Sequence, residues 1–319
     1  MNYQSINICF MLMCCFGYSQ KIDHLVSFRA IDKDSYFKFH YDNDYFAASD
    51  ENYTQGYSFE FADPVFKKNP INDILIQPKK FEMRYGLAIE HIGFTPDRYD
   101  LLEIQFGDRP FAAAIMLKSY VVGQHVEKKL RFHSAFNLGL IGPGAFGEEM
   151  QVGIHEATGN KTPLGWHNQI KNDIVINYNI GIEKQLLSVR DLLSLQAQSN
   201  LNVGSLFTNI SAGANMVIGN FNSPFTSEAK KSNFQIYLYA QPVFTLVGYD
   251  ATLQGGLITR DSPYTISSSD LERFTAQYNF GLIVQTKTLF FEYTRSSITK
   301  EFATGDLAKW GGVRIGFTF

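Results

Sequence analysis

The chain closes with WGGVRIGFTF (310–319), and this stretch decides the class of fold. Its large apolar side chains recur at every second position, at Val313, Ile315, Phe317 and Phe319. The positions between them carry small or polar residues, Gly312, Arg314, Gly316 and Thr318. Because side chains alternate between the two faces of a strand, this pattern predicts a strand with one apolar face and one polar face.

The same period of two recurs along most of the chain, for example where Phe37, Phe39 and Tyr41 alternate with Lys38 and His40. It predicts about twelve strands, most near the ~10-residue length of a tilted barrel strand. Their ranges are 36–42, 57–61, 81–92, 110–124, 128–141, 170–187, 191–203, 206–219, 235–246, 271–286, 288–294 and 312–319. The fold class we predict is all-β, a transmembrane antiparallel β-barrel with its polar face toward the lumen. The closing strand resembles the last strand of bacterial outer-membrane barrels.

Composition narrows the class of protein. With 28 Lys and Arg against 31 Asp and Glu, the net charge of −3 gives no basic surface for nucleic acid. Aromatic residues make up 15% of the chain, yet mean hydropathy is only −0.13, as expected for sheets that are apolar on one face. No later stretch reaches the ~18 apolar residues of a spanning helix. A closed barrel is then the remaining way to span a membrane, because it too satisfies every backbone group.

The first residues, MNYQSINICFMLMCCFGYSQ, contain an apolar run from Ile6 to Phe16 followed by small residues. This pattern predicts a cleavable signal peptide over 1–19 and a barrel domain over 20–319, although no Lys or Arg precedes the run. A buried N-terminal element is the alternative. All three cysteines lie in this segment, so the mature chain would have no disulfide and no thiolate nucleophile.

The predicted loops are 63–80, 94–108, 142–168, 221–231 and 248–270. The loop 142–168 is the most informative, because residues 148–158 have helical spacing and Gly159 is a natural stop. A short helix there would present Gln151 and His155 one turn apart on one face. A lone histidine is weak evidence for a catalytic site, although histidine is the commonest general base.

The stretch NDYFAASDENYTQGYSFEF (43–61) joins two predicted strands. Asn43 and Asp44 are turn formers at a strand end, so turn chemistry alone explains them. The alternative is that two strand ends hold a reactive site. Asn43 shares the parity of the apolar face and Asp44 does not, which favours a site at the rim of the barrel over one deep in the lumen.

Four pieces of sequence in order resemble one family: NDYFAASDENYTQGYSF (43–59), GDRPFAA (107–113), GLIGPGAFGEEMQVGIHEATG (139–159) with GWHNQI (165–170), and a closing strand after TKEFATGD (299–306). The chain is similar to the outer-membrane lipid A 3-O-deacylases, the LpxR-type enzymes. The resemblance implies a twelve-stranded monomeric barrel whose active site faces the outer leaflet. It also implies calcium-dependent hydrolysis of the 3′-acyloxyacyl ester of lipid A in lipopolysaccharide.

The same resemblance implies roles for individual residues. Asp44 would help to bind Ca²⁺, His155 would activate water, and Asn43 and Thr54 would complete the catalytic site. Gln151 matches a motif position and is expected to contact substrate. The family's oxyanion lysine has no counterpart in TPDRYDLLEIQFGDR (95–109), where Arg98 is the nearest cation, and Lys161 stands where the enzymes have an acidic residue.

The chemistry is coherent by itself. A hard cation held by oxygen ligands stabilises an oxyanion, and histidine can activate water near neutral pH. Three alternatives stay open: a passive barrel that is a small pore or structural protein, a phospholipid acyl hydrolase on the same barrel, and a soluble β-sandwich.

Overall fold

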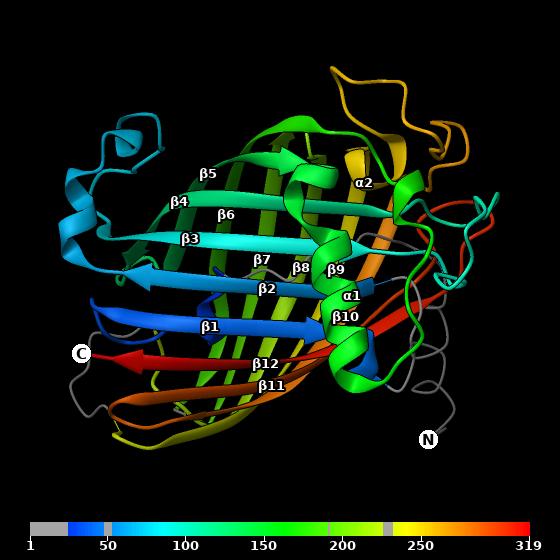
Figure 1. The fold of residues 1–319 in the computed structure, drawn as a ribbon. Helices are drawn as coiled ribbons and strands as arrows, with labels where there is room; N and C mark the ends of the chain where they lie inside the picture. Colours follow the sequence, from blue (N-terminus) through cyan, green and yellow to red (C-terminus); the bar gives the residue numbers. More distant parts are fainter. Residues whose placement is uncertain (1–24, 48–52, 191, 226–231) are drawn as a thin grey trace, which may run out of the picture.

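The computed structural model describes residues 25–47, 53–190, 192–225 and 232–319, and these form one closed antiparallel barrel (Figure 1). Strands follow one another in chain order, and β12 returns to pair with β1. The prediction of twelve strands is confirmed, with strand ends moved by a few residues. The predicted signal peptide, residues 1–19, lies outside the described residues.

The strands are β1 (Tyr36–Asn43), β2 (Tyr53–Ala62), β3 (Glu82–Phe94), β4 (Ala112–His125), β5 (Leu130–Ile141), β6 (Asp173–Val189), β7 (Leu193–Gly204), β8 (Phe207–Asn220), β9 (Gln235–Asp250), β10 (Phe274–Gln285), β11 (Leu289–Ile298) and β12 (Ala308–Thr318). The predicted helix is α1 (Gly147–Thr158), and a second, α2 (Ala251–Gln254), lies in the predicted loop 248–270. Short 3₁₀ turns are η1 (Ser27–Arg29), η2 (Asp44–Ala47), η3 (Pro64–Lys68), η4 (Pro70–Asp73), η5 (Pro143–Ala145) and η6 (Trp166–Asn168).

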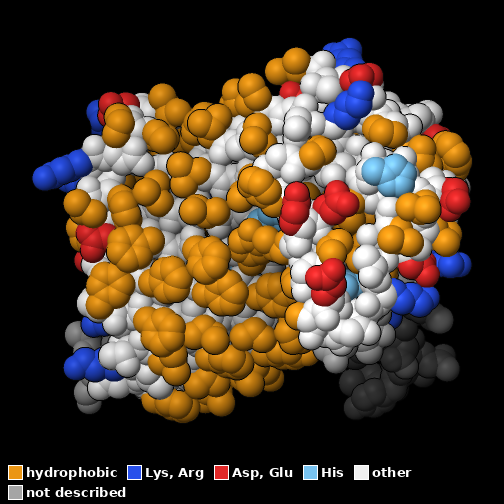
Figure 2. All heavy atoms as spheres, in the orientation of Figure 1, with side chains coloured by type: hydrophobic (Ala, Val, Ile, Leu, Met, Phe, Trp, Pro, Cys, Tyr) orange, Lys and Arg blue, Asp and Glu red, His pale blue; other side chains and the backbone are white. Residues whose placement is uncertain are grey.

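The two faces of the strands separate as the alternation predicted. In β1, Lys38, His40 and Asp42 are buried in the lumen, while the residues between them face outward. The outer wall is a belt of exposed apolar side chains (Figure 2), including Phe59, Phe61, Ile89, Leu117, Leu138, Ile176, Ile210, Leu238, Phe280 and Phe317. This belt fits the hydrocarbon layer of a membrane. None of the helices in the described residues is both long and apolar enough to cross a membrane.

Residues 25–32, here called the plug segment, run inside the barrel. The Nε atom of Arg29 lies 2.8 Å from Glu292 of β11, with both side chains fully buried. The backbone amide and hydroxyl of Ser27 donate to Glu183 of β6 at 2.8 and 2.9 Å. The hydroxyl of Tyr237 donates to the carbonyl of Phe28 at 2.8 Å. The plug segment therefore contacts strands on several sides of the lumen and occupies part of it.

The two ends of the barrel differ. One end, here called the loop end, carries α1, α2 and the connections 95–111, 142–172, 251–273 and 299–307. The other, the turn end, carries tight connections such as 126–129 and 286–288, besides the longer 63–81. The loop end is tied together by Arg109, whose guanidinium lies 3.0 Å from Glu301 and 4.0 Å from the ring centre of Phe94.

Candidate active site

Helix α1 packs on the outer wall of the barrel at the loop end. In β4, Lys118 points into the lumen and pairs with Glu90, so Ala113 has the outward parity. A Cβ added to Gly147, at the start of α1, would lie 2.4 Å from the Cβ of Ala113. Only glycine therefore lets the helix approach the wall this closely. Figure 1 shows α1 crossing the ends of β1, β2 and β3.

Local sequence sets where α1 begins and ends. Gly142 turns the chain out of β5 with a φ of 105°, and Phe146 takes the left-handed conformation immediately before the helix. Glu148 and Glu149 lie in the first turn, where negative charge complements the helix dipole. Gly159, with a φ of 72°, ends the helix. The helix predicted over 148–158 is therefore confirmed with its C-terminal stop.

Gln151 and His155 lie together on the side of α1 that faces the wall. Within α1, only these two residues and Gly147 are buried, at a spacing of four residues. The indole Nε1 of Trp166 donates to Oε1 of Gln151 at 2.7 Å, which fixes the orientation of the amide. The predicted proximity of Gln151 and His155 is therefore present, although the buried face includes Gly147 and excludes the exposed Glu148.

His155 is held by contacts on two sides. Its Nδ1 lies 2.6 Å from the backbone carbonyl of Lys161, and the ring of Tyr99 packs edge-on at 5.2 Å between centroids. Because a carbonyl oxygen only accepts, Nδ1 carries the proton and Nε2 of the neutral ring carries the lone pair. His155 as a whole is buried, with 6% of its surface exposed.

Asn43 and Thr54 meet where β1 ends and β2 begins. The Nδ2 of Asn43 donates to the backbone carbonyl of Thr54. Thr54 lies at a β-bulge in the pairing of β2 with β3, and its hydroxyl is 2.7 Å from that of Thr95. Bulges redirect side chains and recur next to active sites. Asp44 begins η2 and is buried, with 3% exposure.

Outward residues of β2 and β3 line the wall beside the start of α1. His91 stacks on Tyr57 at 4.9 Å between ring centres, and its Nε2 lies 3.0 Å from the carbonyl of Ala145 just before α1. Gln55 is 1% exposed, and its Cγ lies close to Gly93 on this same face. His91 therefore connects this part of the outer wall to the turn that leads into α1, the helix that carries Gln151 and His155.

Arg98 lies in the loop beside His155 but points into solvent. It is 60% exposed in its side chain, and its Nε is 3.0 Å from Asp100. Asp100 also accepts from Lys161 at 3.0 Å. Hydrogen bonds from Arg98 and then Lys161 hold the pKa of Asp100 below its usual range. Lys161 therefore contacts His155 through its carbonyl and Asp100 through its ammonium group.

The predicted Ca²⁺ site at Asp44 can be compared with the oxygen atoms that the structure offers there. Among the described residues, no cluster of three or more His, Cys, Asp or Glu side chains is arranged to hold a metal. Ca²⁺ also accepts amide and backbone carbonyl oxygens. Asp44 and Asn43 supply a carboxylate and an amide oxygen at adjacent positions. This donor chemistry fits Ca²⁺ with few carboxylates, which is typical of weaker sites.

Sequence reasoning missed three contributors, Gln55, Tyr57 and Trp166. Trp166 fixes Gln151 but carries no local signal beyond its place in the motif 165–170. Gln55 could have been found from the sequence, because it is a polar residue with the same parity as the outward aromatic residues of β2. His91 also supports the start of α1, through its contact with the carbonyl of Ala145.

Known proteins resemble this chain in sequence and in fold. A family profile described as "Outer membrane protein LpxR" matches residues 6–319. The solved structure of LpxR from Salmonella typhimurium superposes with a TM-score of 0.73 at 20% identity, covering 89% of this chain and 100% of that chain. The β domain of the Bordetella autotransporter BrkA gives a TM-score of 0.45 at 7% identity, covering 89% and 98%. No curated protein sequence matches the chain.

Proposed function

The chain belongs to the LpxR family of outer membrane proteins, and from this premise we propose that it is a calcium-dependent lipid A 3-O-deacylase. The proposed reaction is hydrolysis of the ester that links an acyloxyacyl chain to the 3′ position of lipid A. One observation carries the proposal: His155 is fixed on a helix against the outer wall with its Nδ1 on the carbonyl of Lys161.

The proposed role of His155 is that of general base. Nε2 takes a proton from water as the water oxygen attacks the acyl carbonyl carbon. The bond between the acyl carbon and the sugar oxygen then breaks, and the proton passes from Nε2 to the departing sugar alkoxide. The products are a carboxylic acid and a free sugar hydroxyl. General-base catalysis of this kind contributes typically about 10²–10⁴-fold in rate.

The remaining site residues would position the reactants. The amide of Gln151, oriented by Trp166, would bind substrate on the same helix face as His155. Asn43 and Thr54 would fix the ester beside the base, since their own contact is already formed. Ca²⁺, held by Asp44 with oxygens of Asn43 and the backbone, would polarise the ester carbonyl. Arg98 is the proposed cation for the lipid A headgroup, because its guanidinium is exposed.

Access from the membrane supports a lipid substrate. The proposed base is on α1, which packs on the outer wall at the loop end of the apolar belt, and long loops of outer-membrane barrels are extracellular. An acyl chain in the outer leaflet would therefore reach α1 without entering the lumen. The plug segment also argues against the passive pore, because Arg29 and Ser27 bind side chains on strands across the lumen.

The test is mass spectrometry of lipid A from cells that express the chain, together with thin-layer analysis of their phospholipids. We expect loss of one acyloxyacyl unit with the wild type and none with His155→Ala. The matched control is His167→Ala, because His167 also contacts a backbone carbonyl through Nδ1, at 3.2 Å, but is exposed.

Each outcome of this test has a separate meaning. Unchanged lipid A from an abundant, folded barrel would overturn the proposal. Released phospholipid acyl chains that depend on His155 would assign the same machinery to another lipid. Loss of activity in both histidine variants would show that the effect does not come from the proposed base.

A further inference from the structure

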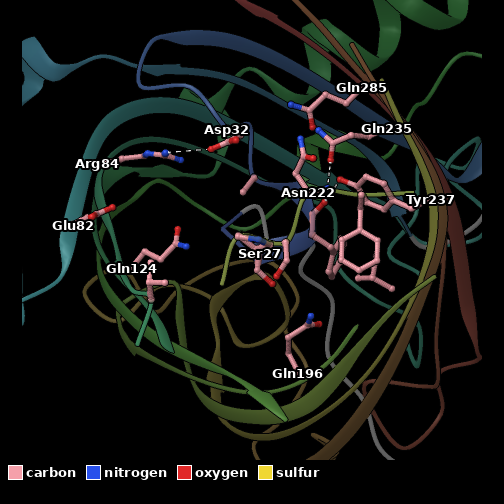
Figure 3. Close-up of a pocket in the computed structure, with 17 residues that line it drawn as sticks. Ser27, Asp32, Glu82, Arg84, Gln124, Gln196, Asn222, Gln235, Tyr237 and Gln285 are labelled. Carbon is pink, nitrogen blue, oxygen red and sulfur yellow. Dashed lines mark hydrogen bonds and ion pairs between the residues drawn. The ribbon is translucent and has the colours of Figure 1, made fainter. Parts of the chain in front are cut away.

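A cavity lies inside the barrel at the turn end, away from the outer wall that carries α1 and His155. Its volume is about 260 Å³. The plug segment forms one side through Ser27 and Ala30, and β4, β7, β9 and β10 supply other sides. Figure 3 shows amide side chains around Ser27, from Gln124, Gln196, Asn222, Gln235 and Gln285. None of these residues takes part in the proposed reaction.

Three of these amides retain hydrogen-bonding capacity that the described part of the chain does not use. Gln196 is 2% exposed and donates to Ser194, but its Oε1 has no partner. The side chains of Gln124 and Gln285 form no hydrogen bond within the described ranges, and Gln285 is only 6% exposed. Buried amides are normally satisfied, so Gln196 and Gln285 point to a ligand with matching donors and acceptors, and the partly exposed Gln124 adds a third amide to the same cavity.

The other residues that line the cavity indicate the charge and polarity of a fitting ligand. Phe221, Val217 and Tyr237 give the cavity apolar surface beside the amides. The charged lining residues are Asp32 and Arg84, which pair with each other at 3.6 Å and are partly exposed, and Glu82, which is exposed to solvent. A buried charge on a ligand would find no counter-charge among the amides, and burying an unpaired charge is costly. The cavity therefore favours a neutral ligand.

We propose that this cavity binds a neutral sugar of about one ring in size. Each amide offers both a donor and an acceptor, as each sugar hydroxyl does, and the apolar lining suits the C–H face of the ring. The volume lies just below the roughly 300–1,000 Å³ of ordinary ligand pockets, which favours a small ligand. The turn end of an outer-membrane barrel faces the periplasm, so the sugar would enter from that side.

The test measures binding of N-acetylglucosamine to the full-length barrel by saturation-transfer NMR. The detergent must lack a sugar headgroup, because a maltoside would compete for the cavity. We expect saturable binding with a Kd of about 1 mM or tighter. The double substitution Gln196→Leu with Gln285→Leu should weaken binding at least about tenfold, or about 1.4 kcal/mol. Gln277→Leu is the matched control, a buried amide on β10 that bonds Asn279 outside the cavity.

A further variant, Ala30→Phe, tests the binding proposal even if the double variant does not fold. Ala30→Phe leaves every amide in place but fills the cavity from the plug segment, so it should also abolish binding. Saturable binding lost in the double variant or in Ala30→Phe, and kept in Gln277→Leu, supports the proposal. No saturable binding by the wild type up to about 10 mM, or equal binding by all variants, overturns it.

Discussion

Replacing Arg29 by Met tests whether the plug segment is anchored by charge. Arg29 donates from Nε to both carboxylate oxygens of Glu292, at 2.8 and 3.1 Å, and from Nη2 to Tyr239 at 2.9 Å. Its guanidinium also lies 4.8 Å from the ring centre of Phe28. Removing one partner of a buried ion pair typically costs about 3–5 kcal/mol. Arg314 remains 2.7 Å from Glu292, so we expect the lower end, about 3 kcal/mol.

The assay is urea unfolding of the barrel in lipid vesicles, with conductance across planar bilayers measured on the same preparations. Arg29→Met should lower the unfolding free energy and open conducting events that the wild type lacks. Arg84→Met is the control, because Arg84 forms partly exposed ion pairs with Asp32 at the end of the plug segment and with Asp34 just after it. Such pairs are worth about 0–1 kcal/mol, so this variant should stay closed and nearly as stable.

A loss below about 1 kcal/mol for Arg29→Met, with no new conductance, would refute the reasoning. It would mean that Ser27 and the apolar contacts of Phe28 hold the plug segment. The buried ion pair would then contribute almost nothing to the free energy of unfolding. Arg29→Lys separates charge from geometry, because lysine keeps the charge but loses the planar fork of donors. We expect it to fall between the wild type and Arg29→Met.

Three further predictions concern the wall site. EDTA should abolish deacylation and Ca²⁺ restore it, while Asp44→Asn should raise the Ca²⁺ concentration needed; activity unchanged by EDTA would exclude the metal. Gly147→Val should displace α1 from Ala113 and lower kcat without unfolding the barrel, as checked by heat-modifiable migration. The contacts with Arg98 and then Lys161 lower the pKa of Asp100, so they stabilise the loop fully above the ordinary carboxyl pKa of about 4. This stabilisation is lost as the pH falls through the lower pKa of the folded state. Asp100 therefore stays ionised from pH 5 to 9, and Asp100→Asn should change activity by the same factor throughout this range. A factor that varies with pH in this range would contradict the lowered pKa of Asp100.

The strands and their faces were predictable because alternation is a local property of the chain. Phe37 and Phe39 face outward and Lys38 faces inward, as the sequence pattern indicated. The plug segment was not predictable, because it has no period of its own. Its position depends on Arg29 meeting Glu292, which lies 263 residues away in the sequence. Such a pairing is fixed by closure of the barrel and leaves no local pattern.

The candidate site was predictable in part for the same reason. Helical spacing placed Gln151 and His155 together, and strand parity placed Asn43 on the outer wall. The partners that hold them were not predictable, since the carbonyl of Lys161 and the indole of Trp166 come from the loop after α1. A backbone carbonyl carries no signal in the sequence, because every residue has one.

Polar residues with outward parity carry the strongest argument for where chemistry occurs on this barrel. A polar side chain facing lipid is unfavourable, so Asn43 and Gln55 would weaken a wall that served only as a membrane anchor. Gln55 is nevertheless buried, and His91 beside it contacts the turn that starts α1. The lumen, in contrast, is crossed by the plug segment and contains paired charges such as Lys38 with Glu60 at 3.0 Å. A lipid-processing site therefore fits the outer wall beside α1, where polar groups are shielded from the membrane and an acyl chain can still approach them.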